Sequence, residues 1–225
     1  AIERIAPTLR VLRHADGGLA RFHGGGRGIE GQLDHALASS AVKPGLARGL
    51  AMGFLRLSAG RTTVIMDVAA PPGGRAAATA HASTLGFELT SGRRPLIVNC
   101  GSGAPFGLDW RRAGRATPSH STLAIEGVSS SRFGIGAGDL LTDRAAVLTV
   151  RQMATEAGNG VHAAHDGWAS THGLSHARDM ALSGDGRMLS GADTLIALNP
   201  QGKARFERVL SASGLKGVPF TIRFH

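Results

Sequence analysis

The sequence predicts a mainly β protein, an antiparallel two-sheet β-sandwich with a short N-terminal helical segment. Three observations support this fold class. The 225 residues include 33 glycines, which divide the chain into short runs. After about residue 50 these runs alternate between apolar and polar residues. No helical crossover of about a dozen residues, which parallel strands would need, separates them. Short strands joined by glycine-rich turns therefore favour a sandwich.

The first fifty residues differ from the rest, because their apolar residues recur at helical spacing. The expected elements are a helix over residues 1–13 that starts or bends at Pro7, a hairpin of 9–13 with 19–23, and a helix over 29–42 that ends before Pro44. We assign residues 1–50 to this segment and residues 51–225 to the sandwich domain. The last strand reaches the final residue, and we expect the sandwich to be truncated there.

The alternating part of the chain predicts ten strands. They cover residues 62–68, 84–89, 96–100, 121–126, 145–153, 161–168, 178–183, 193–198, 204–210 and 220–224. Within this set, residues 81–101 form a predicted hairpin around a Ser91-Gly92 turn. Alternation along its first strand is expected to place His81 on the same face as Leu85 and Phe87.

Charge and composition limit the kinds of partner that the protein can have. The net charge of +9 indicates an anionic partner. We expect no nucleic acid, because aromatic residues are few and the arginines are scattered. No apolar run approaches the ~20 residues that span a bilayer, so no membrane insertion is expected. The single cysteine, Cys100, excludes an internal disulfide framework.

Two glycine-rich motifs near residue 25 suggest chemistry that the rest of the chain does not support. Residues 26–31 spell GxGxxG, but no acidic residue follows at the distance that a dinucleotide fold requires. His23 and the three glycines after it resemble the oxyanion loop of some esterases, yet no serine lies in a G-x-S-x-G elbow. We interpret these glycines as a turn.

Three polar residues at strand ends are candidates for a zinc site. His81 begins one predicted strand, Asn99 ends its partner, and His120 opens a later strand. Two imidazoles and an oxygen donor suit Zn²⁺, which accepts three protein ligands plus water. The alternative is that both histidines are ordinary strand-end residues bonded to the backbone.

Several segments together resemble the β-sandwich region of the heparinase II/III family of polysaccharide lyases and its relatives that act on alginate. They are residues 9–20, the hairpin 81–101, His120-Ser121-Thr122-Leu123, residues 165–168 with 176–178, and 223–225. The hairpin and the His-Ser-Thr segment are the most specific. The resemblance implies that an N-terminal α/α toroid packs on the sandwich, with the helix over 1–13 as the last toroid helix.

The resemblance also implies a reaction, which is β-elimination on uronic acids of an acidic polysaccharide similar to heparin, heparan sulfate or alginate. One group neutralises the carboxylate, a base removes the C5 proton, and an acid protonates the C4 oxygen. Neutralisation comes first because a proton beside a bare carboxylate is too weakly acidic. By the same analogy the location is the periplasm or cell envelope.

Carried over residue by residue, the family pattern is incomplete. Its Asn-His-x-His motif falls on residues 78–81, with Ala78 at the Asn and Thr79 at the catalytic His. His81 then matches a metal ligand, Asn99 stands where an Asp is usual, and His120 matches the second His. A shifted alignment instead makes His81 catalytic. The chain has no Tyr, so it lacks the toroid's acid/base residue and is expected to be inactive alone.

Three further residues, His165, His176 and Arg178, are candidates for substrate binding, because they can face the cleft and bind sugar carboxylates. The alternative is that they are surface residues of strands. We interpret the chain as the sandwich part of a polysaccharide lyase with a structural zinc. The competing interpretation is a non-catalytic carbohydrate-binding or structural sandwich, which the missing Tyr and Thr79 favour.

Overall fold

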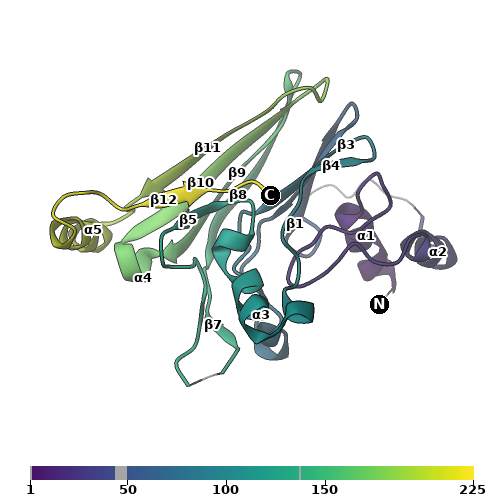
Figure 1. The fold of residues 1–225 in the computed structure, drawn as a ribbon. Coiled ribbons are helices and arrows are strands. Elements are labelled where there is room, and N and C mark those ends of the chain that lie inside the picture. Colours follow the sequence, from purple (N-terminus) through teal and green to yellow (C-terminus); the bar gives the residue numbers. More distant parts are fainter. Residues whose placement is uncertain (1, 44–49, 137) are drawn as a thin grey trace.

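Two four-stranded antiparallel sheets dominate the computed structural model, which describes residues 2–43, 50–136 and 138–225. They run side by side in Figure 1. The first sheet contains β1 (Phe54–Ala59), β2 (Thr62–Asp67), β3 (Phe87–Ser91) and β4 (Arg94–Ile97), in that order. The second has the order β11 (Leu189–Ile196), β10 (Leu174–Ser183), β9 (Gly158–Trp168) and β8 (Val147–Thr155). Every neighbouring pair is consecutive in the chain, so both sheets are meanders.

Shorter elements surround the sheets. The two additional strand pairs are β5 (Leu123–Ile125) with β12 (Phe220–Ile222) and β6 (Arg132–Phe133) with β7 (Leu141–Asp143). The α-helices are α1 (Ile2–Leu12), α2 (Gln32–Ser39), α3 (Leu108–Arg115), α4 (Ala169–His172) and α5 (Pro200–Ala212), and the 3-10 helices are η1 (Gly74–Ala78), η2 (Ala104–Phe106) and η3 (Thr117–Ser119). Among the helices in the described ranges, none is long and apolar enough to cross a bilayer.

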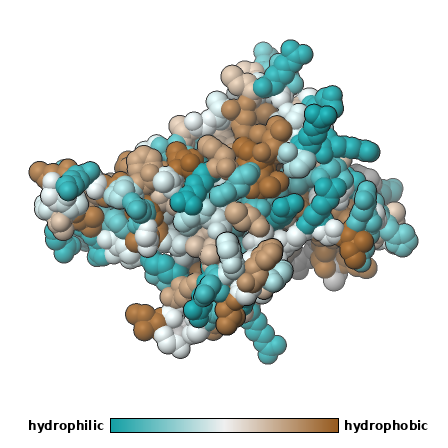
Figure 2. Space-filling model, in the orientation of Figure 1, coloured by the Kyte–Doolittle hydropathy of each residue, from teal (hydrophilic) through white to brown (hydrophobic). Residues whose placement is uncertain are grey.

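The main core lies between the two large sheets. It combines Leu55 and Met66 from the first sheet with Val161, Met180 and Leu182 from the second, and all five side chains are buried. Burying a side chain of this kind contributes about 1.5–3 kcal/mol. Between the sheet edges this apolar interior opens to the surface as a groove, and Figure 2 shows hydrophobic residues gathered below the hairpin tips.

The predicted fold class is confirmed, since the structure has two antiparallel sheets preceded by a short helix. Nine of the ten predicted strands overlap an observed strand. The exception is the strand predicted over 204–210, which is wrong because α5 covers these residues. The helix begins after Asn199, whose side chain accepts the Gly202 N–H, and Pro200 occupies the first helical turn.

Other boundaries also differ from prediction. Residues 81–86 are loop rather than strand, and Leu85 there has a left-handed backbone with φ 66°. His81 therefore does not share a strand face with Phe87. The first hairpin is reduced to one bridge between Arg13 and Leu19, because α1 continues to Leu12. The second predicted helix ends at Ser39, and Pro44 lies outside the described residues.

Candidate functional site

Two buried histidines from neighbouring loops form the centre of the site. His81 precedes β3 and His120 follows η3, and the His81 Nδ1 lies 3.3 Å from the His120 Nε2. Burial, then the charges of His23 and Arg115, lower the pKa of His81 to about 3. Burial, with the charge of His81 next, lowers the pKa of His120 well below its usual range. Both imidazoles are therefore neutral at pH 7 and keep a lone pair.

The distance between these nitrogens fits two kinds of interaction. Two nitrogens bound at about 2.0–2.1 Å to one tetrahedral Zn²⁺ lie roughly 3.3–3.4 Å apart. An N–H···N hydrogen bond has a similar length. Within the described structure, His120 Nδ1 and the hydroxyls of Ser121 and Thr122 are buried with no hydrogen-bond partner. Such orphaned atoms in consecutive residues are unusual, and they favour a bound group at this segment.

Asn99, the third predicted ligand, lies beside the same segment. Its Oδ1 accepts the Ser121 N–H at 3.1 Å, and its Nδ2 donates to Glu88 at 3.4 Å. An amide oxygen has a second lone pair, so this bond leaves room for one more interaction. In the described ranges no three His, Cys, Asp or Glu side chains are placed to hold a metal together. A zinc ion here would have the two imidazoles of His81 and His120 as ligands and would need the Asn99 amide oxygen as the third.

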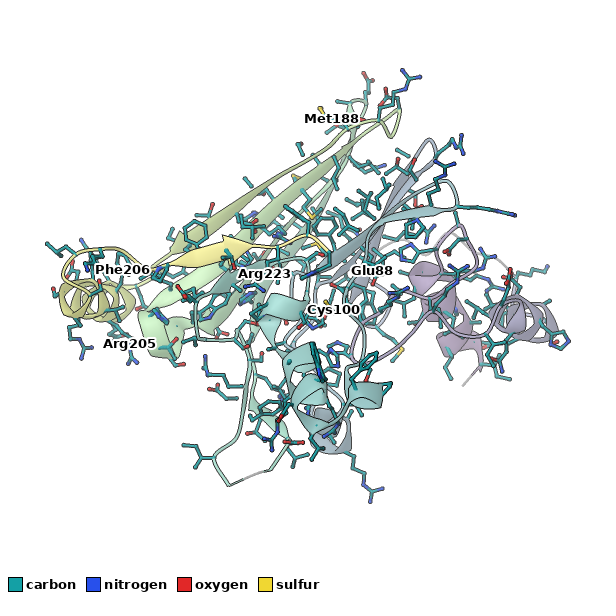
Figure 3. The ribbon with its side chains drawn as sticks, in the orientation of Figure 1. Glu88, Cys100, Met188, Arg205, Phe206 and Arg223 are labelled. Carbon is teal, nitrogen blue, oxygen red and sulfur yellow. The ribbon has the colours of Figure 1, made fainter. Side chains whose placement is uncertain are left out.

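Glu88 on β3 fixes the position of Asn99. Its Oε1 accepts the backbone N–H groups of Asn99 and Arg21, and its Oε2 lies 2.9 Å from the Nε2 of His14. Figure 3 labels Glu88 close to Cys100, the neighbour of Asn99, at the centre of the molecule. Both His14 and Glu88 are buried. This pair was not predicted, because the two residues are 74 positions apart in the sequence.

A third imidazole, His23, adjoins the site and was not predicted. Its Nδ1 accepts the His81 N–H at 3.1 Å, and its Nε2 lies 3.3 Å from an Asp67 carboxylate oxygen that also accepts the Ser83 hydroxyl. Its backbone φ is 48°, an uncommon value outside glycine. A side chain on Gly24 would meet the His81 ring at 3.3 Å. The His-Gly-Gly-Gly motif thus makes a turn, as predicted, and that turn packs on His81.

The three predicted substrate-binding residues lie elsewhere, in the interior of the second sheet. His165, His176 and Arg178 are at most 3% exposed. The Gly167 N–H donates to His165 Nδ1, His165 Nε2 lies 3.2 Å from His176 Nδ1, and His176 Nε2 lies 2.6 Å from Asp193. Arg178 binds Asp193 with two nitrogens, at 2.7 and 2.9 Å, and also the backbone oxygens of Leu85 and Ser121.

This placement corrects the expectation that the three residues face a cleft or the surface. The bond from Gly167 puts the His165 proton on Nε2, and the chain of contacts then puts the His176 proton on Nε2, toward Asp193. Every nitrogen of both rings has a partner, and neither is accessible to a sugar. We therefore interpret the three residues, together with Asp193, as a structural network. Trp168, which is fully buried, likewise belongs to the core.

The comparisons with known proteins agree with this fold. The model of the heparinase II/III-like, C-terminal family matches residues 41–225. The chain belongs to this family. A curated relative, the FtsZ-localized protein C of Caulobacter vibrioides, is 31% identical over 234 aligned residues, which include the whole of this chain and 38% of the relative.

A solved structure of a heparinase III superposes with a TM-score of 0.59 at 15% identity, covering 82% of this chain and 30% of that one. At this identity the likeness shows the fold. The chain spans well under half the length of both proteins. The family resemblance seen in the sequence is thus confirmed, whereas the metal role and the division at residue 50 stay predictions.

Proposed function

We propose that this chain is the sandwich part of a polysaccharide lyase that cleaves uronic-acid glycans by β-elimination, with its own N-terminal α/α toroid supplying the remaining catalytic groups. The observation that carries the proposal is the buried, neutral pair of His81 and His120 beside the loop on which the family motif falls. The +9 charge suits an acidic polysaccharide. The proposed location, by family analogy, is the periplasm or cell envelope, which cell fractionation tests.

The residues of this chain support the reaction rather than perform it. β-Elimination needs a base for the C5 proton and an acid for the C4 oxygen. Thr79 occupies the motif position of the catalytic histidine and donates its hydroxyl to Ala76 O. His81 is almost fully buried. Its neutral ring is held between His120 and the His23 turn, which suits a supporting role, so we assign the proton transfers to the toroid.

A structural zinc is part of this proposal, held by His81, His120 and Asn99. When bound by His81 Nδ1 and His120 Nε2, the ion would fix the two loops against each other, and the unpaired His120 Nδ1 would not be among its ligands. No step of the elimination is routed through it.

Absorbance of the unsaturated uronate product tests the lyase proposal. The full-length protein is incubated with heparin, heparan sulfate and alginate, and we expect absorbance to rise with at least one of them. The same protein carrying His81→Ala is expected to lose most of the rate by loosening the loop. No product from any acidic glycan, at a concentration where binding is measured, would contradict lyase activity.

The second candidate is a non-catalytic glycan-binding or structural sandwich, and specific observations favour it. Thr79 and Asn99 both depart from the family motif, and the chain has no Tyr. The relative that aligns over the whole chain has a name that states localisation with FtsZ and no polysaccharide cleavage. Under this alternative the full-length protein binds acidic glycans, or none, without releasing unsaturated products.

A further inference from the structure

Three arginines of α3 converge on a single aspartate. Arg111 Nη1 lies 2.7 Å from one carboxylate oxygen of Asp139, Arg112 Nε lies 2.9 Å from the other, and Arg115 Nη1 donates to the Asp139 backbone oxygen. Asp139 belongs to the connection between β6 and β7. Counting these three cations against Asp139 and Asp109, the exposed aspartate of α3, leaves one positive charge in excess.

The three arginines have different surroundings. Arg115 is buried, donates to the backbone oxygens of Ala77 and Ala80, and stacks on Phe133 with its guanidinium 4.7 Å from the ring centre. All three guanidinium nitrogens of Arg115 therefore donate to backbone oxygens and hold the surrounding loops. Arg112 has a side chain that is 57% exposed and only its Nε atom bonded to Asp139. In the described structure neither of its terminal nitrogens has a hydrogen bond to the protein.

This cluster adjoins the loop on which the family motif falls. Arg111 Nη2 donates to the backbone oxygen of Ala78 at 2.9 Å, directly before Thr79. The helix is therefore fastened to the motif segment by Arg111, and the next residue, Arg112, bears an exposed guanidinium. An acidic glycan that reaches this loop would pass close to Arg112.

We propose that Arg111 and Arg112 form a recognition site for the carboxylate of an acidic sugar, and that Asp139 occupies this site when no glycan is bound. A carboxylate held by two guanidinium groups has the same chemistry as a uronate in the same place. The Asp139 side chain is 22% exposed, so a ligand can reach it. Partly exposed ion pairs of this kind are individually weak, which makes exchange with a ligand feasible.

The identity of the ligand as a uronate glycan rests on the proposed function, whereas the competition between Asp139 and an external carboxylate does not. A purely structural clasp, in which Asp139 only fastens the β6–β7 connection to α3, makes the opposite prediction for one variant. Removing the Asp139 charge would leave glycan affinity unchanged or lower it in a clasp. It raises the affinity if Asp139 is a competitor.

The experiment is a binding titration read out by tryptophan fluorescence. Trp110 is 64% exposed and precedes Arg111, whereas the other tryptophan, Trp168, is fully buried. Purified protein is titrated with oligomers of a polyuronic acid, with neutral dextran as the comparison ligand. We expect binding of the polyuronate alone, about two- to fivefold tighter in Asp139→Asn and weaker by a similar factor in Arg112→Gln. Arg187→Gln, at an exposed arginine of the β10–β11 turn, should match the wild type.

Three results would overturn the proposal: no binding of polyuronate by the wild type, affinity in Asp139→Asn that is equal to or below the wild type, or an equal loss in Arg112→Gln and Arg187→Gln. Equal effects on a single-stranded oligonucleotide would overturn the assignment to glycans. Should Asp139→Asn fail to fold, Asp139→Ser removes the same charge and decides between competitor and clasp, and Arg112→Gln still tests the guanidinium site. Tighter binding in Asp139→Asn without product formation would contradict the lyase and leave this site standing.

Discussion

The molecule buries two pairs of histidines, and they differ in how their nitrogens are satisfied. In the His165–His176 pair each of the four ring nitrogens has a partner, and the series ends on Asp193. In the His81–His120 pair the rings contact each other, but His120 Nδ1 is buried without a partner in the described structure. Both pairs are neutral, for the same reason of burial.

This difference separates a structural network from a candidate ligand site. A buried polar network stabilises a fold when all of its members are paired, and an unpaired member costs free energy. The first pair lies within one sheet, where register fixes His176 opposite His165. The second pair joins two loops, where no ladder of backbone bonds fixes the rings. We therefore expect substitutions at the first pair to change stability alone, and substitutions at the second to change the response to zinc.

The largest effect is expected from Asp193→Asn. Although burial raises it, hydrogen bonds from His176 and Arg178 lower the pKa of Asp193 to about 2, so the native network contains a carboxylate. Its removal leaves the guanidinium of Arg178, which is 3% exposed, without a counter-charge. The free energy of unfolding should fall by about 3–5 kcal/mol in urea denaturation.

Asp179→Asn is the matched control, because Asp179 lies on the neighbouring strand and pairs with His162 at 2.8 Å in a more exposed setting. We expect a change below about 0.5 kcal/mol there. An equal loss of unfolding free energy in the two variants would show that the buried network stabilises the fold no more than an exposed ion pair does.

Acid should destabilise the protein through the same network. Burial, with the charges of His176 and Arg178, lowers the pKa of His165 well below its usual range, and burial lowers that of His176 despite Asp193. The unfolded chain takes up protons on these rings near pH 6.5 and the native protein does not. The free energy of unfolding therefore falls below pH 6.5, by up to about 1.4 kcal/mol per pH unit for each ring. Urea melts from pH 7 to pH 5 that do not change would contradict the neutral assignment.

Gly167→Ala is expected to disturb the same pair through sterics. A Cβ at Gly167 would lie 2.6 Å from the Ser130 oxygen and 3.0 Å from His165 Nδ1. We expect a loss of about 1–3 kcal/mol in thermal or urea unfolding. Gly26→Ala is the control, since a Cβ there meets nothing within 4 Å. An unchanged free energy of unfolding in Gly167→Ala would show that the structure relaxes around the added methyl group without cost.

The most specific expected change, in zinc affinity rather than in stability, comes from Asn99→Asp, which also places a second carboxylate beside buried Glu88 and so lowers the free energy of unfolding without zinc. A carboxylate attracts Zn²⁺ by its charge, which a neutral amide does not. Zinc affinity measured by competition with a chelator should rise by roughly an order of magnitude or more. Unchanged affinity would show that Asn99 is not a ligand. His162→Asp, on the exterior of the second sheet, is the comparison variant.

Much of the fold could be predicted from the sequence because apolar alternation survives wherever one strand face packs on a core. Met180 and Leu182, for example, alternate with the less buried Asp179 and Ala181 on β10 and enter the same cluster as Phe87. The sequence does carry signals of α5, with Asn199 and Pro200 at its start and Phe206, Val209 and Leu210 at helical spacing, and they contradict the strand predicted there. The loop at 81–86 was missed because its residues are as buried as those of a strand.

The candidate site was predicted in part. The approach of His81 to His120, which are 39 positions apart, was expected from their places at predicted strand ends and from the family motif. His23 was not predicted, because its role depends on a left-handed turn and a backbone contact to His81. Residues His165, His176 and Arg178 were assigned to the surface or the cleft because their polarity suggested exposure. Mutual pairing with Asp193 instead allows their burial.

The shift in melting temperature on adding zinc tests the central claim. The claim is that His81 and His120 can bind a metal ion, whereas His165 and His176 form a fully paired structural network. At a free zinc concentration about 100 times the dissociation constant, linkage gives about 2.7 kcal/mol, or roughly 5–10 °C for a chain of this length. We predict that shift for the wild type and Gly167→Ala, and its loss in His120→Gln. A wild-type protein that zinc does not stabilise, or equal stabilisation of His120→Gln, would contradict the account.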